Sequence, residues 1–172
     1  MKILTAYFSR RGLNYAAGGI VDLPVGNTEA AAKMIAELTG CDLYEIERAE
    51  PYSKEYRGCV DEAKAELAAD ARPALKTAPP DISAYDAVIL GYPNWCGTMP
   101  MPVWTFLESG DFSGKVIAPF CTNEGSGLKR SVDDINRLCP GADQKEGLSI
   151  RGCQVGSARG DIERWLKKLG LI

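Results

Sequence analysis

The chain has 172 residues, of which 45% are hydrophobic and 25% are charged, a composition typical of a globular protein. Its formal net charge of −3 argues against a nucleic-acid-binding protein, because such proteins carry a clear excess of Lys and Arg. The absence of histidine excludes imidazole-based catalytic triads and zinc sites with histidine ligands. This length fits one domain over residues 1–172.

The six cysteines form no C-x-x-C pair and no other short paired spacing. A zinc or iron–sulfur site is therefore not expected, and we predict no metal. The sequence carries no recognisable export signal, so we expect reduced thiols and a cytoplasmic location. Residues 87–107 form an uncharged run, but its three prolines and two glycines argue against a membrane helix.

Short apolar strands alternate with amphipathic helices along the chain. The strands are expected at residues 2–8, 42–46, 87–90, 115–120 and 147–150, and the helices at about residues 28–38, 52–69, 101–107, 128–138 and 162–169. Ala31 and Ile35 lie at helical spacing in the first helix, and Gly40 ends it. The alternation predicts a single doubly wound α/β domain with a five-stranded parallel sheet and helices on both faces.

Sheets of this kind bind ligands outside the carboxyl ends of their strands, so the loops after the first, third and fourth strands are expected to form one site. After the first strand, Ser9, Asn27 and Thr28 offer neutral hydrogen-bond donors near a helix N-terminus, which suits a phosphate. Gly26 permits close approach of the backbone. Ordinary helix capping explains the same residues equally well.

An insertion over residues 13–25 makes this first loop longer than a strand-to-helix turn requires. It forms either a flap over the ligand or a simple surface excursion. Arg10 and Arg11 could reach the phosphate, or they could pair with Asp22 or Glu29 instead.

The second loop carries Trp95, which a flat aromatic ligand would explain, although the ring could also fold back onto the domain. Pro93 stiffens this loop, and Gly97 allows a peptide flip that would present a carbonyl oxygen to the N–H of a reduced flavin. The third loop, residues 121–127, is rich in glycine and either approaches a ring edge or forms an ordinary turn. A phosphate site combined with an aromatic site indicates FMN.

Three motifs resemble those of flavodoxins. Ser9 followed by Gly26-Asn27-Thr28 is similar to the S/T-x-T-G-N-T phosphate loop, here split by the insertion. Residues 91–98, GYPNWCGT, resemble the G-Y-P-x-W-W-G-T loop of one flavodoxin-like branch, and residues 122–127, TNEGSG, resemble its T-H-E-G-S-G loop. The resemblance covers nearly the whole chain. It implies the flavodoxin-like strand order 2-1-3-4-5 and FMN as the cofactor.

By this resemblance, the first motif binds the FMN phosphate, the second lines the isoalloxazine ring, and the third closes its other side. The expected cofactor-binding residues are Ser9, Arg11, Gly26, Asn27, Thr28, Pro93, Asn94, Trp95, Cys96, Gly97, Thr98, Glu124, Gly125 and Ser126. Three positions depart from the motifs: Val25 replaces a threonine, Cys96 replaces the second tryptophan, and Asn123 replaces the histidine.

The leading functional hypothesis is an electron-transfer flavoprotein with no catalytic residue of its own. Its partners would be a reductase and an electron acceptor, with no nucleic acid and no membrane, and it would be a monomer or weak dimer. The alternative is an FMN-dependent NAD(P)H:quinone or flavin reductase. A remote alternative is a cysteine phosphatase, because Cys153 and Arg159 satisfy the C-x5-R pattern.

Overall fold

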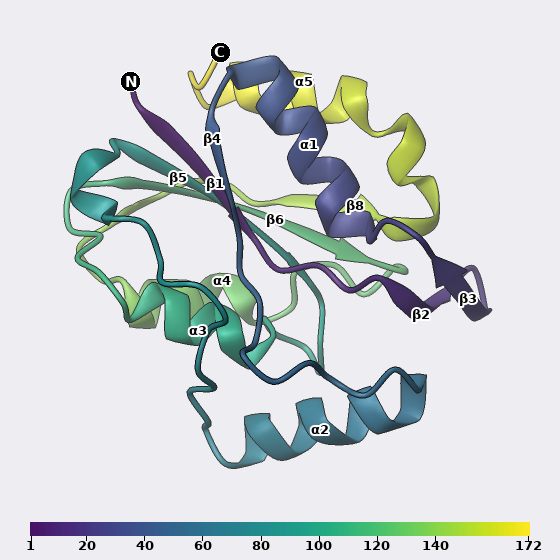
Figure 1. Ribbon diagram of the computed structural model, residues 1–172. Helices are drawn as coiled ribbons and strands as arrows, with labels where there is room; N and C mark the ends of the chain where they lie inside the picture. Colours follow the sequence, from purple (N-terminus) through teal and green to yellow (C-terminus); the bar gives the residue numbers. More distant parts are fainter.

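The computed structural model describes all residues, 1–172, as a parallel sheet between two layers of helices (Figure 1). The strands of this sheet are β1 (Ile3–Tyr7), β4 (Asp42–Glu45), β5 (Ala87–Pro93), β6 (Val116–Asn123), β7 (Asp143–Gln144) and β8 (Leu148–Arg151). They lie in the order β4-β1-β5-β6-β7, and β8 also pairs with β6. The predicted parallel sheet and its strand order 2-1-3-4-5 are confirmed, with β7 and β8 sharing the fifth position.

This fifth position is split because the edge chain bulges. Between two paired positions, β6 advances three residues, from 117 to 120, while the edge chain advances four, from 144 to 148. The break lies beside Pro119, which has no N–H to donate to a ladder. The sequence predicted only the part that became β8, because a two-residue strand such as β7 shows no periodicity.

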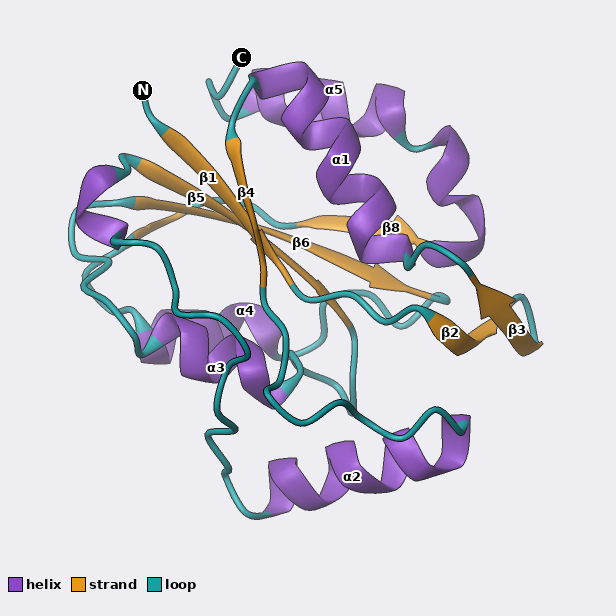
Figure 2. Cartoon of the chain, in the orientation of Figure 1, coloured by secondary structure: helices purple, strands orange, loops and turns teal.

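Helices cover both faces of the sheet (Figure 2). α1 (Asn27–Thr39) and α5 (Arg159–Lys168) lie on one face, while α3 (Met101–Leu107) and α4 (Ser131–Leu138) lie on the other, with α2 (Tyr56–Ala68) farther out beside α3. Two short 3-10 helices, η1 (Ile82–Ala84) and η2 (Gly152–Ser157), complete the chain. No helix is both long enough and apolar enough to span a bilayer.

The alternation of side chains along β1 divides the apolar residues into two cores. Leu4 and Ala6 join the core under α3 and α4, and Ile3 and Tyr7 join the core under α1 and α5. Gly40 ends α1 with φ 67°, and its N–H donates to the carbonyl oxygen of Ala36, which confirms the predicted terminus. The sheet is therefore buried on both faces, and its carboxyl edge remains available for polar loops.

Two central strands extend farther toward that edge than the sequence indicated. β5 and β6 each continue three residues beyond the predicted end and pair Pro93 with Thr122 at the last position. The residues expected in loops at 91–93 and 121–123 are thus strand residues. The backbone hydrogen bonds of the sheet therefore fix the positions of these residues, which flexible turns would not do.

The insertion forms a β-hairpin, β2 (Gly12–Ala16) and β3 (Gly19–Leu23), which lies beside the carboxyl end of β1. Its two-residue turn has Ala17 at φ 51° and Gly18 at φ 87°. Positive φ at both central residues is the geometry of a type I′ turn, which matches the twist of a hairpin. The segment between β4 and α2 passes beneath this hairpin in Figure 1.

Gly91 is the glycine of the central sheet with the least space for a side chain, so its replacement should destabilise the fold. A Cβ atom there would lie 2.1 Å from the Phe120 ring, which is fully buried. We expect Gly91→Ala to lower the free energy of unfolding by about 1–3 kcal/mol through overpacking, as measured by urea denaturation. Gly156→Ala is the matched control, because no atom lies within 4 Å of its Cβ position. Equal stability of the two variants would contradict the packing described here.

Candidate functional site

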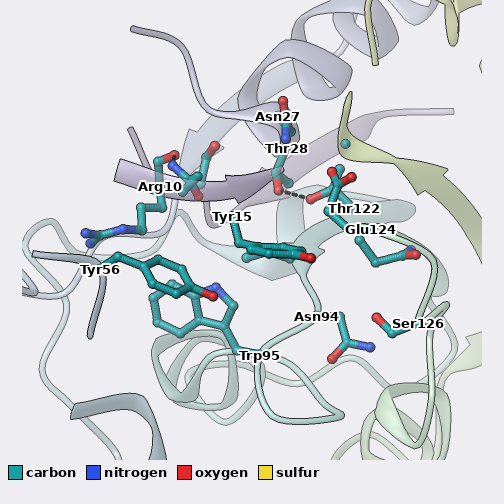
Figure 3. A pocket seen from close by; sticks show the side chains of 15 residues that line it. Arg10, Tyr15, Asn27, Thr28, Tyr56, Asn94, Trp95, Thr122, Glu124 and Ser126 are labelled. Carbon is teal, nitrogen blue, oxygen red and sulfur yellow. Dashed lines mark hydrogen bonds between the residues drawn. The ribbon is translucent and has the colours of Figure 1, made fainter. Parts of the chain in front are cut away.

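A cavity of about 350 Å³ opens at the carboxyl ends of β1, β5 and β6 (Figure 3). The three loops that the sequence assigned to one site meet there. The expected residues that line it are Ser9, Asn27, Thr28, Pro93, Asn94, Trp95, Glu124 and Ser126. The lining residues outside that expected set are Arg10, Asn14, Tyr15, Tyr56, Thr122, Asn123 and Gly152.

The N-terminus of α1 points its backbone into one end of the cavity. Gly26 is the N-cap residue and makes no side-chain cap; instead, the N–H of Glu29 donates to Ser9 Oγ at 3.0 Å. A Cβ on residue 26 would lie 2.1 Å from Ser9 Oγ and 2.7 Å from the Arg10 carbonyl oxygen. Gly26 therefore lets the end of β1 lie against the helix, and Ser9 supplies the cap. Asn27 and Thr28 do not serve as caps.

Two threonine hydroxyl groups form the floor beside this helix end. Thr28 Oγ1 and Thr122 Oγ1 are 2.7 Å apart, and their residues are only 2% and 4% exposed (Figure 3). Their mutual hydrogen bond uses the O–H of only one of the two groups, so the other O–H remains a free donor in a buried position. Asn27 lies nearby, since a Cβ on Gly152 would come within 2.5 Å of Asn27 Nδ2. Neutral donors and the positive end of a helix dipole therefore meet in one small volume.

The two arginines of the first loop have different surroundings. Arg11 does not line the cavity: its Nε donates to Glu29 at 2.8 Å and its Nη2 reaches Glu45 at 3.2 Å. Of the two arginines, only Arg10 lines the cavity. Arg10 donates to three backbone carbonyl oxygens, those of Leu13, Ser53 and Lys54, and pairs with no carboxylate.

Glu29 gives this region a pH dependence of stability. Burial opposes its ionisation, but hydrogen bonds from Arg11 and Lys33 outweigh burial and hold its pKa below the ordinary 4.5. The ionised carboxylate therefore stabilises the fold at pH values above this ordinary pKa. Its contribution to the free energy of unfolding disappears as the pH falls through the lowered pKa. We expect Arg11→Ala to lower the free energy of unfolding by about 1 kcal/mol at pH 7, a modest cost because Arg11 is half exposed.

The measurement is urea unfolding at pH 7 and at a series of lower pH values, and the difference from the parent protein should shrink as the pH falls through the lowered pKa of Glu29. Arg57→Ala is the control, since Arg57 is exposed on α2 and makes no ion pair. A difference that stays constant across this pH range would show that Arg11 acts through packing alone.

Trp95 begins a tight turn whose remaining residues face away from the cavity. Its N–H and carbonyl oxygen pair with Thr98 at 2.9 and 3.2 Å, with Cys96 at φ 55° and Gly97 at φ 83°. This is again the type I′ geometry. Cys96 is exposed at the tip, Thr98 donates to Asp134 at 2.6 Å, and the Gly97 carbonyl oxygen accepts from the Arg130 N–H at 3.2 Å. The peptide flip at Gly97 stays a prediction.

The Trp95 ring packs on the domain and also forms a wall of the cavity. Its centroid lies 5.0 Å from that of Phe8 and 5.1 Å from that of Tyr52, both edge-to-face. The interpretation that the ring folds back onto the domain is thus confirmed, and its contact with a flat ligand stays a prediction. The contacts fix the ring in place, so one face is presented to the cavity without the entropy cost of ordering a free side chain.

Two asparagine side chains shape the loops around the cavity. Asn94 Nδ2 donates to the Gly127 carbonyl oxygen at 2.8 Å, and Asn94 Oδ1 accepts from Gly97 N at 3.0 Å. Asn123 Oδ1 accepts from the N–H groups of Gly125 and Gly127 at 2.9 and 3.0 Å. Gly125 itself faces Arg151 rather than the cavity. Asn123, which departs from the motif, therefore organises the third loop.

The hairpin closes the remaining side of the cavity. Tyr15 projects from β2 across the cavity (Figure 3). Glu124 fastens the hairpin to the third loop and η2, because Oε2 accepts from Ala17 N at 3.2 Å and Oε1 accepts from Cys153 N at 2.9 Å. The insertion is therefore a flap over the cavity. No sequence signal identifies Tyr15 or Tyr56 as a site residue, because the pattern of both segments predicts exposed side chains.

The C-x5-R pattern does not form a phosphate cradle. Residues Gly152–Ser157 form η2, and the Arg159 guanidinium donates to Glu37 at 2.6 Å instead of facing Cys153. A hydrogen bond to the Glu124 carboxylate raises the pKa of the Cys153 thiol, whereas a phosphatase nucleophile requires a lowered one.

The sequence matches the flavodoxin family model over residues 2–169, and the chain belongs to the flavodoxin family. A candidate flavoprotein from Bacteroides eggerthii is 29% identical, with TM-score 0.79 and coverage of 98% of each chain. One from Bacteroides uniformis is 29% identical, with TM-score 0.76 and coverage of 96% of this chain and 97% of that one. A Lactobacillus acidophilus flavoprotein in complex with FMN shares the fold at 22% identity, with TM-score 0.67 and coverage of 91% and 97%. None of the curated proteins matches this sequence.

Proposed function

We propose that this flavodoxin holds FMN in the cavity described above and transfers electrons between a reductase and an acceptor protein. The observation that carries the proposal is the juxtaposition, in one cavity of about 350 Å³, of a helix N-terminus with neutral donors and a fixed tryptophan ring. The first suits a phosphate and the second suits a flat ring system. FMN is the cofactor of this family member, and it contains both groups.

The phosphate end would be held by Ser9, Asn27 and Thr28. Their side chains lie around the first turn of α1, where the free backbone N–H groups and the helix dipole favour a dianion. Arg10 adds a positive charge that no carboxylate neutralises. Val25, which replaces a threonine of the motif, is 42% exposed and does not line the cavity, so Arg10 takes over the role of an additional phosphate partner.

The ring end would be bounded by Trp95 on one side and by Tyr15 and Glu124 on the other. When bound, FMN supplies the reversible electron chemistry, and the protein contributes binding, orientation and local charge. Glu124 already accepts a backbone N–H at each carboxylate oxygen, so its side chain is held in place at the ring end of the cavity.

The test is reconstitution of purified protein with FMN, followed by absorbance and fluorescence titration. Quenched flavin fluorescence and a saturable spectral shift are expected. The carrier role is tested next, with NADPH added alone or together with a separate flavodoxin reductase. Reduction only in the presence of the reductase supports the carrier, and unquenched FMN fluorescence throughout would overturn the proposal.

An FMN-dependent NAD(P)H:quinone or flavin reductase is the second candidate. It requires room for a second ligand, and a cavity of about 540 Å³ that also touches Trp95 favours it. Steady oxidation of NAD(P)H by the FMN-loaded protein plus a quinone, without any reductase, would support this candidate over the carrier.

A further inference from the structure

The two buried threonine hydroxyl groups on the floor of the cavity leave one hydrogen without a partner. Thr28 Oγ1 and Thr122 Oγ1 bond to each other at 2.7 Å and make no other hydrogen bond (Figure 3). Each hydroxyl has a single hydrogen to donate, so whichever group donates to the other, the remaining O–H has no acceptor in the protein. Both residues line the cavity and are less than a tenth exposed. A buried donor without an acceptor is costly, and its position here indicates an acceptor atom supplied by the ligand.

Two further donors without partners lie next to this pair. The backbone N–H groups of Asn27 and Thr28, in the first turn of α1, make no hydrogen bond, whereas the N–H of Glu29 is capped. If Thr28 carries the free O–H, three unpaired donors lie on two consecutive residues at the positive end of the helix dipole. A set of donors with no acceptor among them suits an anionic oxygen.

These surroundings indicate the direction of the hydrogen bond between the two hydroxyl groups. Thr28 lies at the helix end that attracts an anion, whereas Thr122 is fixed in β6, where it pairs with Pro93 on one side and Ile150 on the other. When Thr122 donates to Thr28, the hydrogen of Thr28 can point to the anion. A hydroxyl that accepts one hydrogen bond also donates more strongly, so the two bonds reinforce each other.

We propose that Thr122 is a positioning residue for the cofactor phosphate: its hydroxyl donates to Thr28 Oγ1 and thereby directs the Thr28 hydrogen to a phosphate oxygen. The inference deepens the proposed function and rests on it, because FMN supplies the phosphate at this end of α1. The sequence motifs assigned Ser9, Asn27 and Thr28 to the phosphate. Thr122 adds a residue that acts on the phosphate only through Thr28.

The test is a double-mutant cycle on FMN affinity, measured by fluorescence titration. Thr28→Val removes the hydroxyl that donates to the phosphate and should lower the affinity about 30-fold, as expected for a hydrogen bond to a charged group. Thr122→Val leaves that hydroxyl in place without its orienting partner, so the affinity should fall about fivefold. The double variant should bind FMN like Thr28→Val alone, because Thr122 acts only through Thr28.

Three results of this cycle would overturn the proposal. Losses that add in the double variant would mean that the two threonines act independently. A double variant that matches Thr122→Val would mean that Thr122 itself contacts the phosphate, and an unchanged affinity in Thr122→Val would mean that it has no role. All three leave FMN binding by the parent protein intact. Failure of the parent protein to bind FMN would instead remove the proposed function, and this inference with it.

A second measurement separates the orientation of a hydroxyl from a general structural effect. The phosphorus NMR signal of bound FMN should shift in Thr122→Val and return toward its parent position in Thr122→Ser, which restores an O–H. A signal that does not move in Thr122→Val, or does not recover in Thr122→Ser, contradicts the proposal. Thr122→Ala replaces the valine variant if the latter does not fold.

Thr5→Val is the matched control for both measurements. Thr5 is also a fully buried strand residue with a hydroxyl contact, because its Oγ1 lies 3.0 Å from Cys41 Sγ, but it does not line the cavity. This variant should match the parent protein in FMN affinity and in the phosphorus signal. If Thr5→Val changes both as much as Thr122→Val does, the loss of any buried hydroxyl suffices and Thr122 has no special role.

Discussion

Replacing Gly26 by alanine should reduce FMN affinity by about 100-fold, which corresponds to roughly 3 kcal/mol. The added Cβ would lie 2.1 Å from Ser9 Oγ and 2.7 Å from the carbonyl oxygen of Arg10. The hydroxyl could rotate away, but the Arg10 carbonyl belongs to the backbone, so the end of β1 must move away from α1. That movement would separate Ser9 from the helix N-terminus and break its hydrogen bond with Glu29 N.

The affinity is measured by fluorescence titration, with urea unfolding to record the accompanying loss of stability. Overpacking should account for about 1–3 kcal/mol of that loss. Gly19→Ala is a suitable control, because Gly19 lies in the hairpin with no atom within 4 Å of its Cβ position. If Gly26→Ala binds FMN as well as Gly19→Ala does, the phosphate does not lie at this helix end.

Trp95→Ala should weaken FMN binding by about 1–3 kcal/mol, by analogy with the stacking of nucleic-acid bases on aromatic side chains. The same change should lower protein stability, because Phe8 and Tyr52 each lose an edge-to-face partner. Titration and denaturation therefore need to be read together.

Trp95→Phe separates the two effects. A phenyl ring still stacks on a flavin but covers less area, so this variant should recover part of the FMN affinity and part of the stability. An FMN affinity that is unchanged in Trp95→Ala would exclude Trp95 as a stacking residue, whatever happens to the stability.

The sheet was predictable because its strands are short apolar runs between amphipathic helices. Residues such as Ile89 and Leu90 read as buried strand whatever packs on them, and the position of the site then follows from the topology. The split of the fifth strand was not predictable, because it arises from a register shift beside Pro119 that only the paired chain defines.

Parts of the site were predictable where a motif requires a particular backbone geometry. The glycine at position 26 predicted a close approach of the backbone, and Ser9 lies against it in the structure. The sequence prediction placed Arg11, and not Arg10, among the cofactor-binding residues, whereas Arg10 lines the cavity and Arg11 meets the carboxylates of Glu29 and Glu45, a difference that only the fold defines. Tyr15 could not be found at all, since its role depends on how the hairpin lies against Glu124.

The split edge of the sheet has a consequence for the behaviour of the protein at high concentration. An unpaired strand edge is a template on which a second chain can assemble, and long flat edges are the most hazardous. Here one edge is β4, four residues long, and the other is divided into β7 and β8, of two and four residues. Neither edge of this sheet presents a long continuous ladder, so we expect the sheet to resist edge-to-edge association with a second chain.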